Sequence, residues 1–227
     1  LGHHDWHTDH SDTEVLLQAF RAWGIDCLAR LRGMFAFALW DAVARELWLV
    51  RDRIGVKPLY YAVHRGRVVF GSEIKALLVD PDLERRVDEE ALYHYLSFLA
   101  TPAPQTLFRG IRKLAGGTWL RIGADGSVRG QRWWDAWDAV EPLTGRSDDE
   151  IAALVLERLR ESVRLRKVSD VPVGVFLSGG IDSSTNAALF AEGETRPVRT
   201  FTIGYAGDHP SCRNETAWAR RMADAVG

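Results

Sequence analysis

The pattern of hydrophobic and polar positions in the first third of the chain is that of a hairpin-rich sheet. From Gly33 to Gly71, short apolar runs alternate with polar turns, as in antiparallel strands joined as hairpins. In the run 33–42, apolar side chains fall on both faces of the strand, so further layers are expected above and below this sheet. The expected strands cover residues 33–42, 46–53, 57–63 and 67–71.

Helical patterns precede these strands and return in the second half. Ser11 with Glu14, and Ser147 with Glu150, have the spacing of capping boxes, each of which opens a helix. After Val171, apolar runs alternate with helical segments, which predicts parallel strands joined by right-handed crossovers. Further helices are expected at 88–98, 182–191 and 214–226, and the parallel strands at 173–177 and 198–205.

A polar segment without apolar periodicity, Asp138 to Arg146, is predicted to link two domains. The expected organisation is a first domain over residues 1–137, a linker over 138–146 and a second domain over 147–227. Two parallel strands cannot bury both faces of a sheet, so the second domain is expected to continue beyond residue 227. The absence of an initiator Met leads us to expect a missing start as well.

Composition narrows the classes of function. Hydrophobic residues make up 46% of the 227 residues, and 29 Lys and Arg nearly balance 31 Asp and Glu. That balance argues against a surface for nucleic acid or anionic membranes, and no apolar run is long enough to span a bilayer. No secretory leader is recognisable, and Cys27 and Cys212 match no CxxC pattern, so reduced thiols and a cytoplasmic location are expected.

Three groups of polar or aromatic residues are better explained by structure than by chemistry. The histidines and aspartates of residues 1–10 match no zinc-ligand spacing, so a solvated loop is expected. The charged run 51–53 lies at a strand end and is expected to form a structural ion-pair network. The three tryptophans within 133–137 lack the basic surroundings of a base-stacking surface and are expected to pack at an interface.

The strongest chemical signal is the stretch Val171 to Ser184, VPVGVFLSGGIDSS. A buried strand that runs into Gly179-Gly180 and then into a helix start would present free N–H groups and the positive end of a helix dipole to an anion. The glycines allow a phosphate to approach closely, and the serine hydroxyls can donate hydrogen bonds. Asp182 is suited to holding Mg²⁺ beside a polyphosphate.

This stretch resembles the pyrophosphate-binding loop of the ATP pyrophosphatases and, over its full length, the same run of the glutamine-dependent asparagine synthetases. The resemblance implies an α/β doubly wound ATP pyrophosphatase domain over residues 147–227, C-terminally truncated, with Asp182 as the Mg²⁺ ligand. The ATP- and pyrophosphate-binding residues that it implies are Leu177, Ser178, Gly179, Gly180, Ile181, Asp182, Ser183, Ser184 and Ile203.

The first domain resembles the glutaminase domain of the same family, through the runs RGMFAFALWD, RDRIGVKPLYY and GSEIKALL. This implies an α+β fold, the four-layer αββα sandwich of N-terminal-nucleophile amidotransferases, N-terminally truncated. The run SDTEVLL resembles the segment whose aspartate binds the amino group of glutamine, which implies that role for Asp12. The loop leading into Asp12 is longer than in the family and is expected to be altered.

The resemblance implies ATP-dependent amidation of L-aspartate to L-asparagine by glutamine-derived ammonia, through a β-aspartyl-adenylate with release of AMP and pyrophosphate. It implies glutamine, aspartate and ATP as substrates and Mg²⁺ as cofactor, and allows a homodimer. The family's N-terminal cysteine nucleophile is absent, so no catalytic residue is expected here and the chain alone is expected to be inactive. The alternatives are a relative of the β-lactam synthetases or lasso-peptide cyclases with a non-hydrolytic first domain, or a non-catalytic scaffold.

Overall fold

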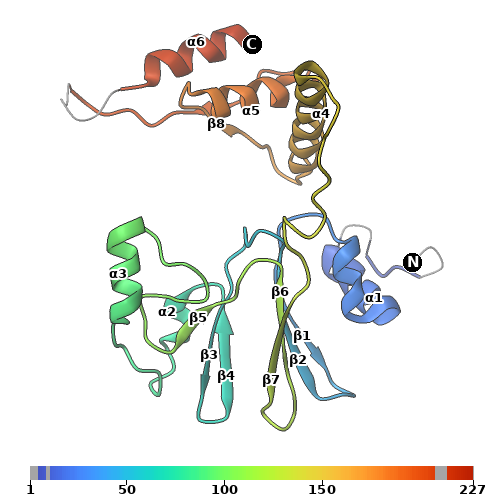
Figure 1. Cartoon of the computed structure of the whole chain (residues 1–227), viewed down its shortest axis with the longest axis vertical. Coiled ribbons are helices and arrows are strands. Elements are labelled where there is room, and N and C mark those ends of the chain that lie inside the picture. Colours follow the sequence, from blue (N-terminus) through green and yellow to red (C-terminus); the bar gives the residue numbers. More distant parts are fainter. Residues whose placement is uncertain (1–4, 9–10, 208–213, 227) are drawn as a thin grey trace. The chain divides into compact units, whose positions relative to one another are not determined.

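The computed structural model describes residues 5–8, 11–207 and 214–226. The chain divides into two compact units, Leu1–Val140 and Glu141–Gly227, each with its own buried core (Figure 1). Residues 1–4 and 9–10 of the loop expected at the N-terminus lie outside the described residues, as does Cys212.

Two antiparallel sheets form the framework of the first unit (Figure 1). One has the strand order β1-β2-β6-β7 and the other the order β4-β3-β5. The expected hairpins are present, with β1 paired to β2 and β3 paired to β4. The strands are β1 Ala36–Asp41, β2 Glu46–Arg51, β3 Tyr60–His64, β4 Arg67–Gly71, β5 Ile111–Lys113, β6 Thr118–Ile122 and β7 Val128–Arg132. The helices are α1 Asp12–Trp23, η1 Gly24–Arg30, α2 Ile74–Leu77 and α3 Glu89–Phe98.

Alternation along the central strands sets the two sheets face to face and puts a helix on each outer side. Leu49 of β2 and Tyr61 of β3 belong to one buried cluster between the sheets. Because successive side chains of a strand point to opposite faces, the next residues, Val50 and Ala62, point outward. Val50 packs with α1 and Ala62 packs with α2. The described part of the first unit therefore has the helix–sheet–sheet–helix layering that was predicted.

Helix α1 begins where the sequence predicts. Ser11 is its N-cap and accepts a hydrogen bond from the Glu14 N–H at 3.4 Å. Gly24 ends the helix with a φ of 58°, a conformation that glycine adopts without strain. The Glu14 carboxylate accepts hydrogen bonds from the N–H groups of His7 and Thr8, both at 2.9 Å. His7 and Thr8 are thus tied to the first turn of α1.

The first strand is shorter and more exposed than predicted. β1 starts at Ala36 rather than at Gly33, and Trp40 is 58% exposed although both faces of this strand were expected to be covered. The reason is that β1 is an edge strand and Trp40 lies next to the β1–β2 turn. The flanking layers cover the Phe37 end of the strand and leave its tip open.

Gly117 joins the end of β2 to the segment that follows β7. Its N–H donates to the Asp52 carbonyl at 2.7 Å, and its own carbonyl accepts from the Trp133 N–H at 2.7 Å. Its φ is 60°, and a Cβ at this position would collide with the carbonyl oxygen of Trp134. Glycine is therefore required where these two parts of the backbone meet.

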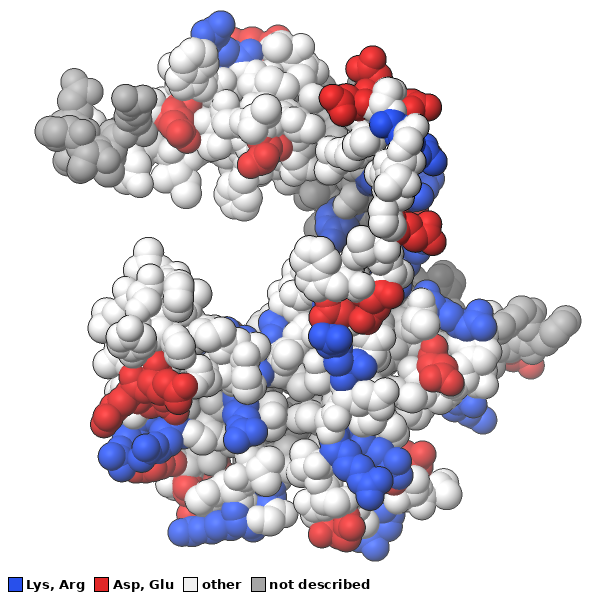
Figure 2. Space-filling model, in the orientation of Figure 1, with Lys and Arg blue, Asp and Glu red and all other residues white. Residues whose placement is uncertain are grey.

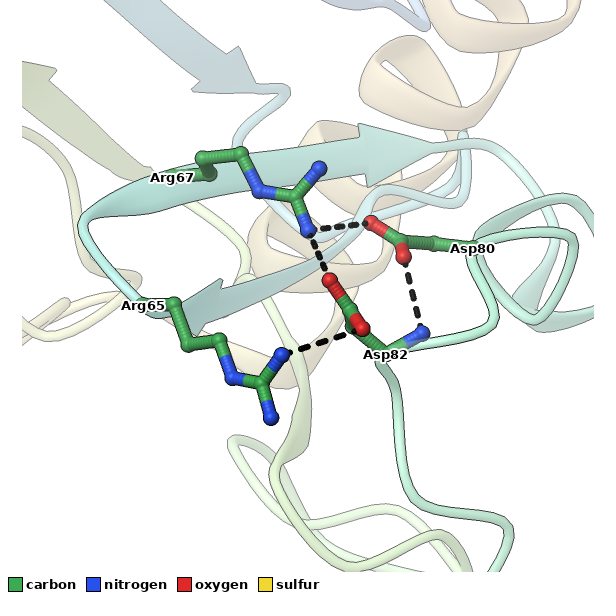
Figure 3. Close-up of polar contacts among 4 residues, drawn as sticks. All are labelled: Arg65, Arg67, Asp80 and Asp82. Carbon is green, nitrogen blue, oxygen red and sulfur yellow. Dashed lines mark hydrogen bonds and ion pairs between the residues drawn. The ribbon is translucent and has the colours of Figure 1, made fainter.

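An exposed ion-pair cluster ties the β3–β4 turn to the loop that follows α2 (Figure 3). Arg65 Nη1 lies 3.1 Å from Asp82 Oδ1, and Arg67 Nη2 lies 2.7 Å from Asp82 Oδ2. Arg67 Nη2 also lies 3.4 Å from Asp80 Oδ2, and the other oxygen of Asp80 accepts from the Asp82 N–H at 3.0 Å. Both carboxylates therefore converge on one side of the hairpin.

We expect Arg67→Ala to lower the free energy of unfolding by about 1 kcal/mol or less, because exposed ion pairs are weak and screened by salt. The measurement is urea unfolding at low and at high salt, and the loss should shrink at high salt. Arg86→Ala is the matched control, since Arg86 approaches Glu84 only to 3.9 Å. A loss of several kcal/mol that salt does not change would contradict this reading.

Charges of opposite sign are interspersed on the surface. On the face that Figure 2 displays, Lys and Arg side chains lie next to Asp and Glu side chains. Ion pairs occur in both units, for example Arg65 with Asp82 and Arg158 with Glu161. This mixing agrees with the formal net charge of −2.

The second unit contains a short parallel sheet packed with helices (Figure 1). β8 (Val175–Phe176) pairs with β9 (Thr200–Phe201) in the predicted parallel sense, although each strand is shorter than the apolar run that predicted it. The buried core consists of Val175, Leu177, Ala187 and Ala219. The helices are α4 Asp148–Arg166, α5 Ile181–Ala191 and α6 Thr216–Val226.

Helix α4 has the predicted capping box but a poorly covered apolar face. Ser147 and Glu150 make both reciprocal hydrogen bonds of the motif. Arg160 ties α4 to the end of α5, with Nε and Nη2 at 2.8 and 2.9 Å from the two carboxylate oxygens of Glu192. Val155 and Leu159 are nevertheless 52% and 42% exposed, so the described residues bury only part of this helix.

Candidate functional sites

A pocket of about 480 Å³ opens in the first unit where α1 begins. Its walls are the first turn of α1, the segment 31–37 that leads into and begins β1, the pair Lys57-Pro58, and Ser72. Asp12, which the sequence singles out, lies in the first of these walls. The pocket therefore brings Asp12 together with two segments that were expected only to be strands.

The charges around this pocket suit a small zwitterion. Asp12 is the first residue of α1 and contributes an exposed carboxylate. Arg32 and Lys57 contribute cationic side chains to the same lining. A carboxylate and two cationic side chains around one concave site can pair with the ammonium and the carboxylate of an amino acid.

Asp52 lies behind this pocket and is 1% exposed. Its Oδ2 accepts hydrogen bonds from the N–H groups of Phe35 at 3.2 Å and of Lys57 at 2.9 Å. Its Oδ1 accepts from the Val56 N–H at 2.8 Å. One buried carboxylate thus cross-links the segment before β1 to the turn that carries Lys57.

Arg51 supports the same turn from the other side and is 7% exposed. Its Nε donates to the Lys57 carbonyl at 2.7 Å, Nη2 donates to the Gly55 carbonyl at 2.6 Å, and Nη1 donates to the Leu114 carbonyl. Burial lowers the pKa of this guanidinium, and the nearby charge of Asp52 partly opposes that shift. The partners of Arg51 and Asp52 are backbone groups, which corrects the ion-pair network expected for residues 51–53.

The glycine turn of the second unit has the predicted strand–turn–helix form. The Ser178 and Ser183 hydroxyls lie 3.0 Å apart, and the Ser178 N–H donates to Ser183 Oγ at 3.3 Å. The Gly180 N–H donates to Ser178 Oγ, also at 3.3 Å. Two loop amides are therefore already used in long hydrogen bonds within the turn.

Helix α5 begins without a capping side chain. Gly180 is its N-cap, and within the described parts of the chain no side chain accepts a hydrogen bond from the first N–H groups of this helix. Uncapped N–H groups at a helix start, together with the helix dipole, attract an anion. Asp182 and Ser183, in the first turn, lie next to these donors.

Gly179 brings the turn into contact with α6. Its φ is +85°, and a Cβ there would lie 2.5 Å from Trp218 Cβ and 2.7 Å from the Ala219 nitrogen. Only glycine fits this approach, because any side chain would meet backbone and a ring-bearing residue at once. The position of the turn therefore depends on α6 as well as on β8.

A pocket of about 520 Å³ collects part of the predicted nucleotide-binding set. Four of its lining residues were predicted: Leu177, Ser178, Ser183 and Ile203. The sequence missed its other lining residues, Phe176, Phe201, Thr202, Tyr205 and Glu215. Most of these belong to β8, to β9 or to the few residues after β9, and ligands of parallel sheets bind beyond the carboxyl ends of the strands, so that rule could have found them.

Asp182 faces a different space from the two serines. Together with Ile181 it lines a second pocket, of about 690 Å³, whose other walls include Leu159 and Arg166 of α4. Asp182 is not among the residues that line the 520 Å³ pocket. The structure thus brings Ser178 and Ser183 together but directs Asp182 to the α4 side of α5.

Metal binding by protein groups alone is not indicated in the ranges that the structure describes. Among those residues, no group of three or more His, Cys, Asp and Glu side chains could hold a metal ion. Mg²⁺ beside a polyphosphate needs only one or two protein carboxylates, since phosphate oxygens and water complete its shell. The exposed carboxylate of Asp182 fits that requirement.

Cys27 is the cysteine that the structure describes, and it is fully buried in the α1 layer. Burial raises the pKa of its thiol, and the negative charge of Asp26 raises it further. A protonated, inaccessible thiol is a poor nucleophile. Among the helices of the described ranges, none combines the length and apolar character that crossing a membrane requires.

Comparison with known families gives a match in each of the two units. The family model for the glutamine amidotransferase domain matches residues 2–134, which contain the Asp12 pocket. The chain belongs to this glutamine amidotransferase family. The family model for asparagine synthase matches residues 154–227, which contain the glycine turn. The resemblance to the glutamine-dependent asparagine synthetases that the motifs indicated is thereby confirmed.

Individual relatives agree with this assignment. A putative glutamine-hydrolyzing asparagine synthetase of Mycobacterium bovis is 43% identical over 95% of this chain and 33% of its own length. The glutamine-hydrolyzing asparagine synthetase 3 of Bacillus subtilis is 36% identical over 96% of this chain and 37% of its own length. The chain therefore spans about a third of the length of these relatives.

Among solved structures, a B. subtilis glutamine phosphoribosylpyrophosphate amidotransferase covers 84% of this chain. The match extends over 39% of that structure's own chain, with 18% identity and a TM-score of 0.41.

Proposed function

We propose that this sequence belongs to an enzyme that amidates L-aspartate to L-asparagine with ammonia taken from glutamine, at the expense of ATP. The observation that carries the proposal is the uncapped start of α5 behind the Ser178–Gly180 turn, in a chain that also holds a pocket lined by Asp12, Arg32 and Lys57. The first supplies donors for a polyphosphate and the second supplies a site for the nitrogen donor. The relatives' names support the same pairing.

In this proposal residues 1–137 form the glutaminase-type domain, residues 138–146 the linker, and residues 147–227 part of a doubly wound ATP pyrophosphatase-type domain. Asp12 binds the α-ammonium of glutamine, because its carboxylate lines the pocket. Arg32 and Lys57 supply positive charge for the carboxylate at the other end of the same ligand.

The nucleotide is assigned to the glycine turn and its pocket. The proposed ATP- and pyrophosphate-binding residues are Leu177, Ser178, Gly179, Gly180, Ile181, Asp182, Ser183, Ser184 and Ile203. Asp182 would hold Mg²⁺, which neutralises phosphate charge when bound. Because Asp182 lines the pocket on the α4 side, the phosphates must extend around the start of α5 to reach both it and the serines.

The chemistry follows from the weakness of a carboxylate as an electrophile. Transfer of AMP to the β-carboxylate of aspartate gives a β-aspartyl-adenylate and releases pyrophosphate, and ammonia then displaces AMP. The α5 N–H groups are fixed dipoles directed at the pyrophosphate, so they stabilise its developing charge without reorganising. We also propose that the 227-residue chain alone hydrolyses no glutamine, because the thiol of Cys27 is buried and protonated.

Binding by this chain tests the assignment of the two sites. In an amide NMR titration, L-glutamine is expected to shift resonances of residues 31–37 and Lys57, and MgATP those of residues 177–184. Asp12→Asn should abolish only the glutamine response, because it removes the negative charge that pairs with the ammonium. Asp182→Ala should abolish or strongly weaken only the MgATP response, because it removes the Mg²⁺ ligand.

The controls are Asp26→Asn and Asp170→Ala, which remove exposed carboxylates from the same two units away from the pockets. Both should leave the titrations unchanged. Glutamine-induced shifts that persist in Asp12→Asn would refute the glutamine site. MgATP-induced shifts that persist in Asp182→Ala would refute the role of Asp182 as metal ligand. Ammonia released from glutamine by the chain would contradict the proposed inactivity.

A further inference from the structure

We propose that Asp52 is a positioning residue of the amino-acid pocket, a role that rests on the glutamine-binding function proposed above. Asp52 is 1% exposed and does not line the pocket, so it does not touch the ligand. It acts through the two pocket walls that its carboxylate cross-links. Nothing in the charged run at residues 51–53 indicates this from the sequence.

A single oxygen of Asp52 accepts a hydrogen bond from each of the two walls. Oδ2 accepts from the Phe35 N–H at 3.2 Å and from the Lys57 N–H at 2.9 Å, and both of these residues line the pocket. Oδ1 accepts from the Val56 N–H at 2.8 Å, which fixes the rotation of the carboxylate. Phe35 belongs to the segment before β1 and Lys57 to the turn after β2, so the carboxylate joins the two walls. The Asp52 N–H also donates to the Phe35 carbonyl at 2.8 Å, so side chain and backbone of this residue both hold the first wall.

Arg51 completes the support of the second wall. Its guanidinium donates to the carbonyls of Gly55 and Lys57, at 2.6 and 2.7 Å. Arg51 therefore holds the carbonyl groups of the turn, and Asp52 holds its N–H groups. The turn fits tightly around this group. Gly55 has a φ of +71°, and a Cβ there would lie 3.0 Å from Arg51 Cζ.

The energetics favour a positioning role over general stabilisation. A buried carboxylate is costly unless each oxygen is hydrogen-bonded, and an apolar side chain in its place would not carry that cost. What a carboxylate adds is two acceptor oxygens at a fixed separation, which can hold three N–H groups in one geometry. An amide keeps the shape but has one acceptor oxygen, so its NH₂ group faces the Val56 N–H in one orientation and the N–H groups of Phe35 and Lys57 in the other.

The test is glutamine affinity in the folded chain, measured by the amide NMR titration. Asp52→Asn is expected to weaken L-glutamine binding by about tenfold or more, because an NH₂ group that faces an N–H donor either displaces the turn that carries Lys57 or frees both walls. Thr106→Val is the matched control. Thr106 is 3% exposed, donates to the Ile111 carbonyl at 2.7 Å and lies outside the pocket, so its loss should change affinity less than about twofold at a similar loss of stability.

A milder pair of variants covers the case in which Asp52→Asn does not fold. Gly55→Ala pushes on the Arg51 guanidinium, whereas Gly66→Ala imposes the same kind of backbone strain at φ +74° with nothing within 4 Å. Only Gly55→Ala should weaken glutamine binding, by several-fold.

The outcomes separate this inference from the function beneath it. If the wild-type chain does not bind glutamine, or binds it independently of Asp12, both the proposed function and the positioning role are overturned. If the wild type binds through Asp12 but Asp52→Asn and Gly55→Ala keep its affinity, only the positioning role fails. It fails equally if Thr106→Val and Gly66→Ala weaken binding as much.

Discussion

Gly179→Ala is expected to unfold the second unit's core or to displace the turn from α6. The new Cβ would lie 2.5 Å from Trp218 Cβ and 2.7 Å from the backbone nitrogen of Ala219, and neither neighbour is the end of a flexible side chain. Overpacking of this kind costs about 1–3 kcal/mol, and the φ of +85° adds about 1–2 kcal/mol for a residue with a Cβ. We therefore expect a loss of about 3 kcal/mol or more.

Amide hydrogen exchange of α6 and of β8 measures this effect, because both pack in the cluster that Gly179 adjoins. Gly193→Ala is the matched control, since Gly193 also has a positive φ, +76°, but meets nothing within 4 Å. It should lose only the backbone contribution. Equal protection from hydrogen exchange in the two variants would show that the close approach of Gly179 to α6 does not contribute to stability.

Leu49→Ala is expected to be the most damaging change in the core of the first unit. Leu49 is fully buried between the two sheets, in the cluster that includes Tyr61 and Leu120. Truncation removes apolar contacts and leaves a cavity that two opposed sheets cannot easily close, so we expect a loss of about 2–5 kcal/mol. Urea unfolding, followed by circular dichroism, gives the change in free energy.

Leu96→Ala is the control for that measurement, because it removes the same atoms from a side chain that is 71% exposed on α3. Its effect should stay within about 0.5 kcal/mol, as is usual for surface substitutions. A loss for Leu96→Ala that approached the loss for Leu49→Ala would mean that α3 is covered in solution. It would also remove the reason for ranking the inter-sheet core first.

Local patterns carried most of what the sequence could predict about the fold. The caps at Ser11 and Ser147 were readable because a cap needs only a hydroxyl and an acid three residues apart. The hairpins and the parallel β8–β9 pair were readable from periodicity. The exposure of Trp40 was not, because it depends on which strand lies at the sheet edge, and strand order is set by contacts distant in sequence.

The sites were predicted less completely. Asp12 came from resemblance, and no periodic pattern would have paired it with Lys57, which lies far along the chain. The role of Asp52 was hidden because its partners are backbone N–H groups, which every residue except proline carries. Asp182 and Ser183 were expected to act together, yet neighbours on a helix point about 100° apart, so they line different pockets.

The Gly117 junction has a mechanical consequence. Its N–H donates to the carbonyl of Asp52, and its own carbonyl accepts from the N–H of Trp133, so a single residue connects Asp52 to the stretch that runs out of the first unit after β7. A pull on that outgoing stretch loads the backbone of Asp52 through two hydrogen bonds in series. Tension arriving from beyond Trp134 would therefore reach the backbone of Asp52, behind the pocket that Asp12 lines.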